Sequence, residues 1–171
     1  MNYDTTLEWH KALLVLIAQR LQPASYLELG CRTDPAFLHL SAFCKAVTGV
    51  DRDQALYTKP SNATIYQMTT DEFFLMFGKT IAPPDLVLID ACHERHQVLR
   101  DFENVRAICA DNALVVFHDT ANNSYVDPLL CDNSYLAAQD IVERGFELVT
   151  LPFPPGISIC RPKPVSLVSV L

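Results

Sequence analysis

Two short apolar runs of this chain end in acid and imidazole side chains. Asp90 and His93 follow the first run, and His118 and Asp119 follow the second. Packing alone does not explain an acid at the end of a buried strand, because an unpaired buried carboxylate is costly. In an open α/β sheet, ligands bind at the carboxyl ends of the strands. The two runs therefore predict a site above two neighbouring strands.

These side chains are suited to metal binding and proton transfer. Asp90 and Asp119, on adjacent strand ends, could share a divalent cation that lowers the pKa of a substrate hydroxyl. His93 or His118 could act as a base, because imidazole titrates near neutral pH. Each residue also has a structural interpretation. Asp90 could bind backbone amides of the next loop, His93 could cap the following helix, and His118 could pack against a neighbouring strand.

A second group of residues predicts a nucleoside subsite. Gly30 leaves the first predicted strand, and Asp51 ends the second about 20 residues later, the separation between a nucleotide-binding turn and an acid that binds ribose hydroxyls. The loop lacks the GxGxxG pattern and carries Arg32 and Asp34 where a pyrophosphate needs close backbone approach. This argues against a dinucleotide and favours an adenosyl ligand without phosphates. The alternative is that Asp51 only caps the segment after its strand.

Strands and helices alternate along most of the chain. The pattern predicts a Rossmann-like, doubly wound, mostly parallel seven-stranded sheet, with helices on both faces and a C-terminal antiparallel hairpin. A capping box at Thr5 and Glu8 begins the first helix, and another at Thr69 and Glu72 begins a later one. Strands are expected over about 26–30, 46–51, 63–68, 85–90, 113–119, 146–151 and 156–160. Helices are expected over about 5–22, 34–45, 93–108 and 134–145, and a further helix rich in Phe is expected after Thr69.

Composition narrows the class of protein. The chain has 171 residues, half of them hydrophobic, and a net charge of −7, which argues against a nucleic-acid partner. The apolar stretches 12–18 and 165–171 are too short to span a membrane. The six cysteines form no CxxC pair, which favours reduced thiols and a cytoplasmic location. With no repeat or linker, residues 1–171 are expected to form a single domain, with an N-terminal helix over 1–22 and a core over 25–162.

The chain resembles the class I S-adenosylmethionine-dependent methyltransferases, in particular the bacterial small-molecule O-methyltransferase-like group. The fourth strand and following helix of that group read roughly hhhIDGxHxYxxVxxDhE, where h is hydrophobic, and residues 86–103 are similar to this pattern, with Ala91 and Arg95 at its Gly and Tyr positions. Residues 116–120 match the fifth strand of the group. The likeness extends from about Tyr26 to Arg161. It implies a methyltransferase-like domain with S-adenosylmethionine as methyl donor.

The resemblance also implies roles for individual residues. Methyl transfer would go to a small-molecule acceptor, at oxygen, with Mg²⁺ as the candidate cation at Asp90 and Asp119. His93, His118 and Asp90 would be catalytic. Glu28 and Gly30 would contact the methionine moiety of the cofactor, and Asp51 would bind its ribose. The adenine would be covered by Met68, Thr69 and Thr70. Asp90 would also belong to the cofactor-binding residues.

The sequence leaves two functions open. One is an active methyltransferase; the other is a non-catalytic protein that keeps the fold for binding or assembly. The second is kept because the group usually has small residues where Arg32 and Asp34 stand, and an acid near Thr69. A hydrolase is disfavoured because no GxSxG motif is present. The chain adds little to the core sheet, so the site is open or is completed by a second copy in a homo-oligomer. The loop 122–133, expected to select the acceptor, has no readable motif.

Overall fold

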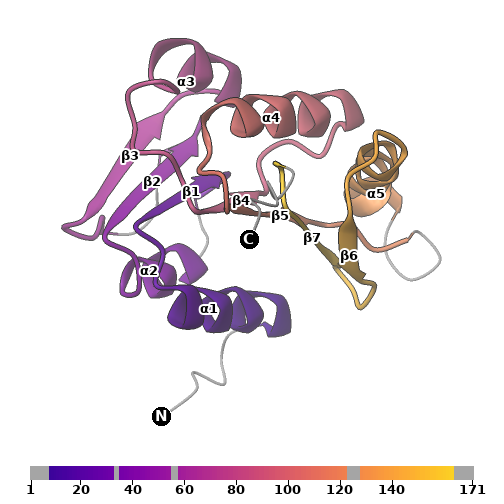
Figure 1. Ribbon diagram of the computed structural model, residues 1–171, viewed down its shortest axis with the longest axis horizontal. Helices are drawn as coiled ribbons and strands as arrows, with labels where there is room; N and C mark the ends of the chain where they lie inside the picture. Colours follow the sequence, from indigo (N-terminus) through magenta and orange to yellow (C-terminus); the bar gives the residue numbers. More distant parts are fainter. Residues whose placement is uncertain (1–7, 33–34, 55–57, 123–127, 164–171) are drawn as a thin grey trace, which may run out of the picture.

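The computed structural model describes residues 8–32, 35–54, 58–122 and 128–163. The strands are β1 (Ser25–Leu29), β2 (Ala46–Asp51), β3 (Ala63–Gln67), β4 (Leu86–Ile89), β5 (Leu114–His118), β6 (Leu148–Leu151) and β7 (Ile157–Cys160). They form one sheet in the order β3-β2-β1-β4-β5-β7-β6 (Figure 1). The strands β1 to β5 pair in parallel, whereas β7 is antiparallel to both β5 and β6. The predicted fold class is confirmed.

Helices cover both faces of this sheet. They are α1 (Trp9–Leu21), α2 (Pro35–Ser41), α3 (Thr70–Met76), α4 (Arg95–Ile108) and α5 (Pro128–Glu143). The helices α1 and α2 lie on one face, and α3, α4 and α5 lie on the other (Figure 1). Alternate strand residues point to opposite faces, so Tyr26 packs in the α1–α2 layer and Leu27 in the layer that includes Phe102 of α4. In the described part of the chain, no helix combines the length and apolarity needed to cross a membrane.

The first helix buries a different face from the one its apolar residues suggest. Spacing would select Trp9, Leu13, Leu16, Ile17 and Leu21, but the buried residues are His10, Leu14 and Ala18. Every residue of this helix from 12 to 18 is apolar, so periodicity does not define one face. Glu8 is the N-cap residue without a side-chain cap, and Thr5 of the predicted capping box lies outside the described residues.

Two helix boundaries also differ from prediction. The helix α2 ends at Ser41 instead of near Lys45, and Asn62 Nδ2 donates to the carbonyls of Ser41 and Cys44, at 2.9 Å each. These bonds satisfy one carbonyl in the last helical turn and one beyond it. The helix α5 begins at Pro128 instead of near Ser134, because proline is well suited to the first helical turn. Residues 123–127 of the predicted loop, and the segment 165–171, lie outside the described residues.

The capping box that opens α3 is confirmed. The Thr69 hydroxyl accepts from the Glu72 N–H, and Glu72 Oε2 accepts from the Thr69 N–H at 2.9 Å. This arrangement fixes the point at which the chain turns from β3 into α3.

Candidate active site

A cleft of about 870 Å³ opens at the carboxyl ends of β1, β2, β4 and β5. It lies where the strand order reverses, because the chain runs outward from β1 to β3 and then returns to β4 on the other side of β1. This switch point is the expected ligand position in an open α/β sheet. The predicted residues that line the cleft are Gly30, Asp51, Met68, Thr69, Thr70, Asp90, His93, His118 and Asp119.

Gly30 allows the turn after β1 to lie directly against the end of β4. Its φ is +97°, and a Cβ atom there would lie 2.1 Å from the carbonyl oxygen of Asp90. No side chain fits in that space. The close contact brings the turn after β1 and the Asp90 backbone into the same wall of the cleft.

The Asp51 carboxylate is fixed by backbone hydrogen bonds at the end of β2. Its Oδ2 accepts from the Arg32 N–H at 3.0 Å, and its Oδ1 accepts from the Asp53 N–H at 2.9 Å. Each carboxylate oxygen can accept a further bond, so the group can also bind ligand hydroxyls. The Arg32 guanidinium lies 3.4 Å from the Asp53 carboxylate, which partly balances its charge at the cleft. Asp34 lies outside the described residues.

The side chains of two residues predicted to bind the cofactor make hydrogen bonds to other groups of the protein. Glu28 is fully buried, is not among the residues lining the cleft, and accepts a hydrogen bond from the Tyr26 hydroxyl. Its position in β1 places it on the same face of the sheet as Tyr26. Thr69 lines the cleft, but its hydroxyl is used in the α3 capping box with Glu72. The structure therefore does not bring the Glu28 side chain to the cleft.

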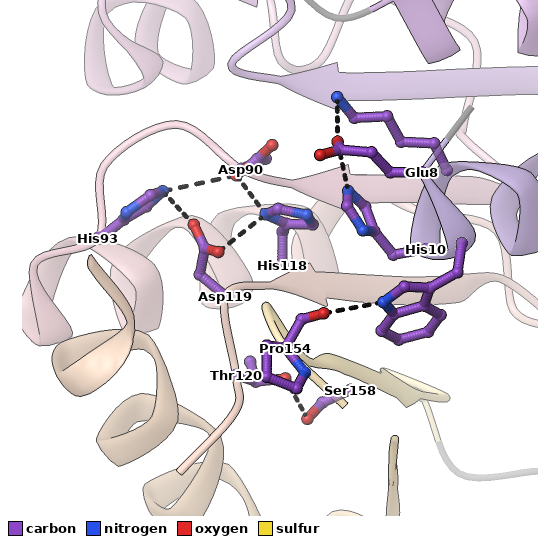
Figure 2. A network of polar contacts seen from close by, with 11 residues as sticks. Glu8, His10, Asp90, His93, His118, Asp119, Thr120, Pro154 and Ser158 are labelled. Carbon is purple, nitrogen blue, oxygen red and sulfur yellow. Dashed lines mark hydrogen bonds and ion pairs between the residues drawn. The ribbon is translucent and has the colours of Figure 1, made fainter. Parts of the chain in front are cut away.

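The two strand-end acids and the two histidines form one cluster (Figure 2). His93 Nε2 lies 3.5 Å from Asp90 Oδ1 and 3.2 Å from Asp119 Oδ2. His118 Nδ1 lies 3.1 Å from Asp90 Oδ1 and 3.3 Å from Asp119 Oδ1. Asp119 has a φ of +56°, a left-handed conformation that is uncommon outside glycine. Backbone strain of this kind is typical of functional sites.

The carboxylates favour the protonated form of both histidines. Burial would lower the pKa of His118, but hydrogen bonds to Asp119 and Asp90 outweigh burial and raise this pKa to about 10. The hydrogen bond to Asp90 is the main reason why the pKa of His93 is also raised. Burial would raise the pKa of Asp90, yet the imidazoles of His118 and His93 lower it overall. His118 is therefore cationic at neutral pH, which does not suit the predicted role of a base there.

The start of α1 adds a histidine that the sequence analysis did not identify. His10 is 3% exposed, and its ring packs against that of His118 with a centroid distance of 4.6 Å. Glu8 Oε2 lies 3.4 Å from His10 Nε2. Trp9 Nε1 donates to the carbonyl of Pro154 at 2.8 Å, which attaches this end of α1 to the turn between β6 and β7 (Figure 2). The only sequence signal was a polar residue at the start of an apolar helix.

Other cleft-lining residues were also missed. They come from α1, the end of β2 and the residue after it, the segment after β4, the first turn of α4, and α5, and include Lys11, Val50, Arg52, Cys92, Glu94, Gln97 and Asn133. Cys92, Glu94 and Gln97 stand at variable positions of the segment that resembles the methyltransferase group, so no motif marked them, and their position in the cleft depends on how the elements pack.

The cluster contains a candidate cation site. Asp90, His93 and Asp119 each offer one ligand atom, and these atoms lie within 4.8 Å of one another. The sequence predicted the two acids, and the structure adds His93. Carboxylates suit Mg²⁺ and Mn²⁺, and imidazole favours transition-metal ions, so the donor set fits Mn²⁺ better than Mg²⁺.

Comparison with known proteins identifies the family. The family described as "Methyltransferase domain" matches residues 14–120, which is more than half of the chain. The chain belongs to this methyltransferase family. The matched residues include the whole cluster around Asp90, but they exclude His10 and the hairpin formed by β6 and β7. A search of curated proteins finds no match.

Solved structures share the fold of this methyltransferase domain at low sequence identity. The Podospora anserina methyltransferase PaMTH1, bound to SAH, is 10% identical with a TM-score of 0.70, covering 92% of this chain and 79% of its own. The O-methyltransferase TomG from Streptomyces achromogenes, in complex with SAM, is 12% identical (TM-score 0.68; 94% and 83% covered). The N-methyltransferase NodS from Bradyrhizobium japonicum is 16% identical (TM-score 0.62; 93% and 97% covered).

Proposed function

We propose that the protein transfers a methyl group from S-adenosylmethionine to an oxygen atom of a small-molecule acceptor. The main support for this proposal is that residues suited to an adenosyl group and residues suited to proton transfer line the same cleft. Gly30, Asp51 and Met68 line the part suited to an adenosyl group, and the cluster around Asp90 and His93 lines the same cleft. A volume of about 870 Å³ lies within the range of small-molecule sites. The SAM-bound and SAH-bound structures with the same fold support this choice of donor.

The reaction requires alignment of the reactants and a destination for one proton. The acceptor hydroxyl oxygen forms a bond to the methyl carbon as the bond from that carbon to sulfur breaks, which leaves a neutral thioether. The hydroxyl proton then passes to a base. In this proposal the base is His93 in its deprotonated form and with no cation bound, because its side chain is 33% exposed, against 12% for His118, and so is more accessible to the acceptor. Cationic His118 holds the carboxylates of Asp90 and Asp119 in place.

The adenosyl subsite makes a direct prediction. Asp51→Ala is expected to weaken binding of S-adenosylhomocysteine at least about tenfold, because the ribose hydroxyls lose charge-assisted hydrogen bonds, which contribute about 1.5–3 kcal/mol. Isothermal titration calorimetry measures the change. Asp53→Ala is the matched control, since this exposed acid also lines the cleft but lies beyond the strand end. It should change the affinity much less.

Two outcomes would contradict this assignment in different ways. If the wild-type protein bound neither S-adenosylmethionine nor S-adenosylhomocysteine at millimolar concentration, methyl transfer would be refuted in favour of the non-catalytic alternative. If both ligands bound and Asp51→Ala left their affinity unchanged, only the ribose role of Asp51 would be lost.

We further propose that a divalent cation can occupy the site made by Asp90, His93 and Asp119. With His93 bound to it, such an ion would act in place of this base, because its Lewis acidity would lower the pKa of the acceptor hydroxyl and let the proton pass to water. Mn²⁺ is expected to bind the wild-type protein more tightly at pH 8 than at pH 6, because protons on His93 compete with it. Calorimetric titration with Mn²⁺ alone tests this. Asp119→Asn should weaken binding at least about tenfold, a loss of about 1.4 kcal/mol; unaltered binding would rule the site out.

A further inference from the structure

The side-chain amide of Gln97 is held by three polar groups at one end of the cleft. Gln97 lies in the first turn of α4 and lines the cleft together with Thr70 and Asp71 of α3. Its Nε2 atom lies 3.1 Å from Thr70 Oγ1, from Asp71 Oδ1 and from Asp101 Oδ1. The amide nitrogen is therefore directed at oxygen atoms of two helices.

These neighbours select one orientation of the amide. A flipped amide would place Oε1 against two carboxylate oxygens with no hydrogen between them. Asp71 is itself held by the Arg100 guanidinium, at 2.6 Å, and Asp101 is fully buried. Burial raises the pKa of Asp101 to about 6, so its carboxylate still accepts hydrogen bonds above neutral pH. The orientation with Nε2 towards the acids is thus strongly favoured.

The same end of the cleft is connected to the ribose subsite. The Met68 N–H donates to the Asp51 carbonyl at 2.9 Å, so the end of β3 lies beside the acid proposed to bind ribose. Met68 also lines the cleft and offers an apolar surface for the face of a purine ring. Thr70 follows two residues later and contacts Gln97. The contacts from Asp51 to Met68 and from Thr70 to Gln97 therefore place Gln97 in the same wall of the cleft as the residues proposed to bind the ribose and the face of the base.

We propose that Gln97 Oε1 accepts a hydrogen bond from the exocyclic amine of adenine and so selects adenine over other purines. Oε1 is the amide atom left over, since the hydrogen bonds of Gln97 within the described residues all use Nε2. A purine with a carbonyl in place of the amine would set two acceptors against each other. The inference rests on the proposed function, because it takes an adenosyl group as the ligand.

The test compares two ligands in each protein variant. S-adenosylhomocysteine and an analogue whose purine lacks the exocyclic amine are titrated calorimetrically at pH 7.5. The wild-type protein is expected to bind S-adenosylhomocysteine at least about tenfold more tightly than the analogue, because the analogue offers no hydrogen-bond donor to Gln97 Oε1. Gln97→Met should reduce this ratio to less than about threefold, by weakening only the amine-containing ligand.

The ratio of the two ligand affinities within one variant does not depend on what fraction of the protein is folded. Gln67→Met is the matched control: Gln67 ends β3, is exposed and is not among the cleft-lining residues, so the ratio should stay as in the wild type. Gln97→Ala removes the same oxygen and serves if the methionine variant does not fold.

Two results would overturn the inference alone. The first is that the wild-type protein binds S-adenosylhomocysteine and the analogue with nearly equal affinity. The second is that the ratio of these affinities is unchanged in Gln97→Met and Gln97→Ala. Each result counts only if S-adenosylhomocysteine still binds. Failure of the wild-type protein to bind S-adenosylhomocysteine would instead overturn the proposed function, and this inference with it.

Discussion

Gly30→Ala is expected to destabilise the protein by at least about 4 kcal/mol, a large share of the stability of a typical domain. The new Cβ would lie 2.1 Å from the carbonyl oxygen and 2.5 Å from the carbonyl carbon of Asp90. Neither the Gly30 nor the Asp90 backbone can move away freely, because both are held by hydrogen bonds. The Gly30 N–H donates to the Val50 carbonyl and the Asp90 N–H donates to the Leu29 carbonyl, at 2.8 Å each. The substitution would separate the ends of β1 and β4, where the cleft is built.

Gly145→Ala is the matched control for this substitution. Gly145 also has a positive φ, +90°, but no atom lies within 4 Å of its ideal Cβ position. Its replacement should therefore cost only the strain of a left-handed residue, about 1–2 kcal/mol. Urea denaturation followed by circular dichroism measures both losses. Equal losses in the two variants would mean that the contact between Gly30 and Asp90 is relieved at little cost.

The stability of the protein is expected to decrease as pH rises from about 6.5 towards about 10, owing to His118. Its pKa is about 10 in the folded state, against 6.5 for an unperturbed histidine. Between these values the folded state keeps a proton that the unfolded state has released. The stabilisation is thus complete below pH 6.5 and is lost as pH passes the folded pKa, with a slope of up to about 1.4 kcal/mol per pH unit.

The shifted pKa values of His93 and Asp90, which lie beside His118, also make the stability depend on pH. The raised pKa of His93 adds stability that is likewise lost as pH rises. The lowered pKa of Asp90 acts at the other end: its stabilisation is present above the ordinary pKa of 3.8 and is lost as pH falls through the folded value. The loss of stability due to His118 therefore occurs at higher pH than the loss due to Asp90.

His118→Asn isolates the contribution of this imidazole. Urea denaturation from pH 6.5 to 9.5 should show that the variant is less stable than the wild type at the acidic end. The two profiles should converge as pH rises, because the wild type loses the proton that the variant never held. A residual slope from His93 is expected in both proteins. Parallel profiles would show that His118 is not protonated in the folded state.

The sequence by itself determined the strands that carry the site and the positions where they end. Strands buried on both faces must be continuous apolar runs, so the acids and histidines after β4 and β5 stood out as interruptions. Parallel neighbours place their carboxyl ends at one edge, which is why Asp90 and Asp119 were expected to meet, and their shared contacts with His93 and His118 agree. The separation of Gly30 and Asp51 likewise placed both in the cleft.

Only the tertiary structure decided which faces of these elements meet. The alternation in β1 was readable, but the side of the sheet that received Glu28 depended on the packing of α1 and α2. His10 reaches His118 because α1 covers the face to which that β5 residue points, a contact between residues far apart in the chain. The protonation of His118 depends in part on Asp90 after β4, and the orientation of Gln97 depends in part on Asp71 of α3. Local patterns specify periodicity and strand ends, whereas pKa values and amide orientation depend on neighbours that only the packed fold supplies.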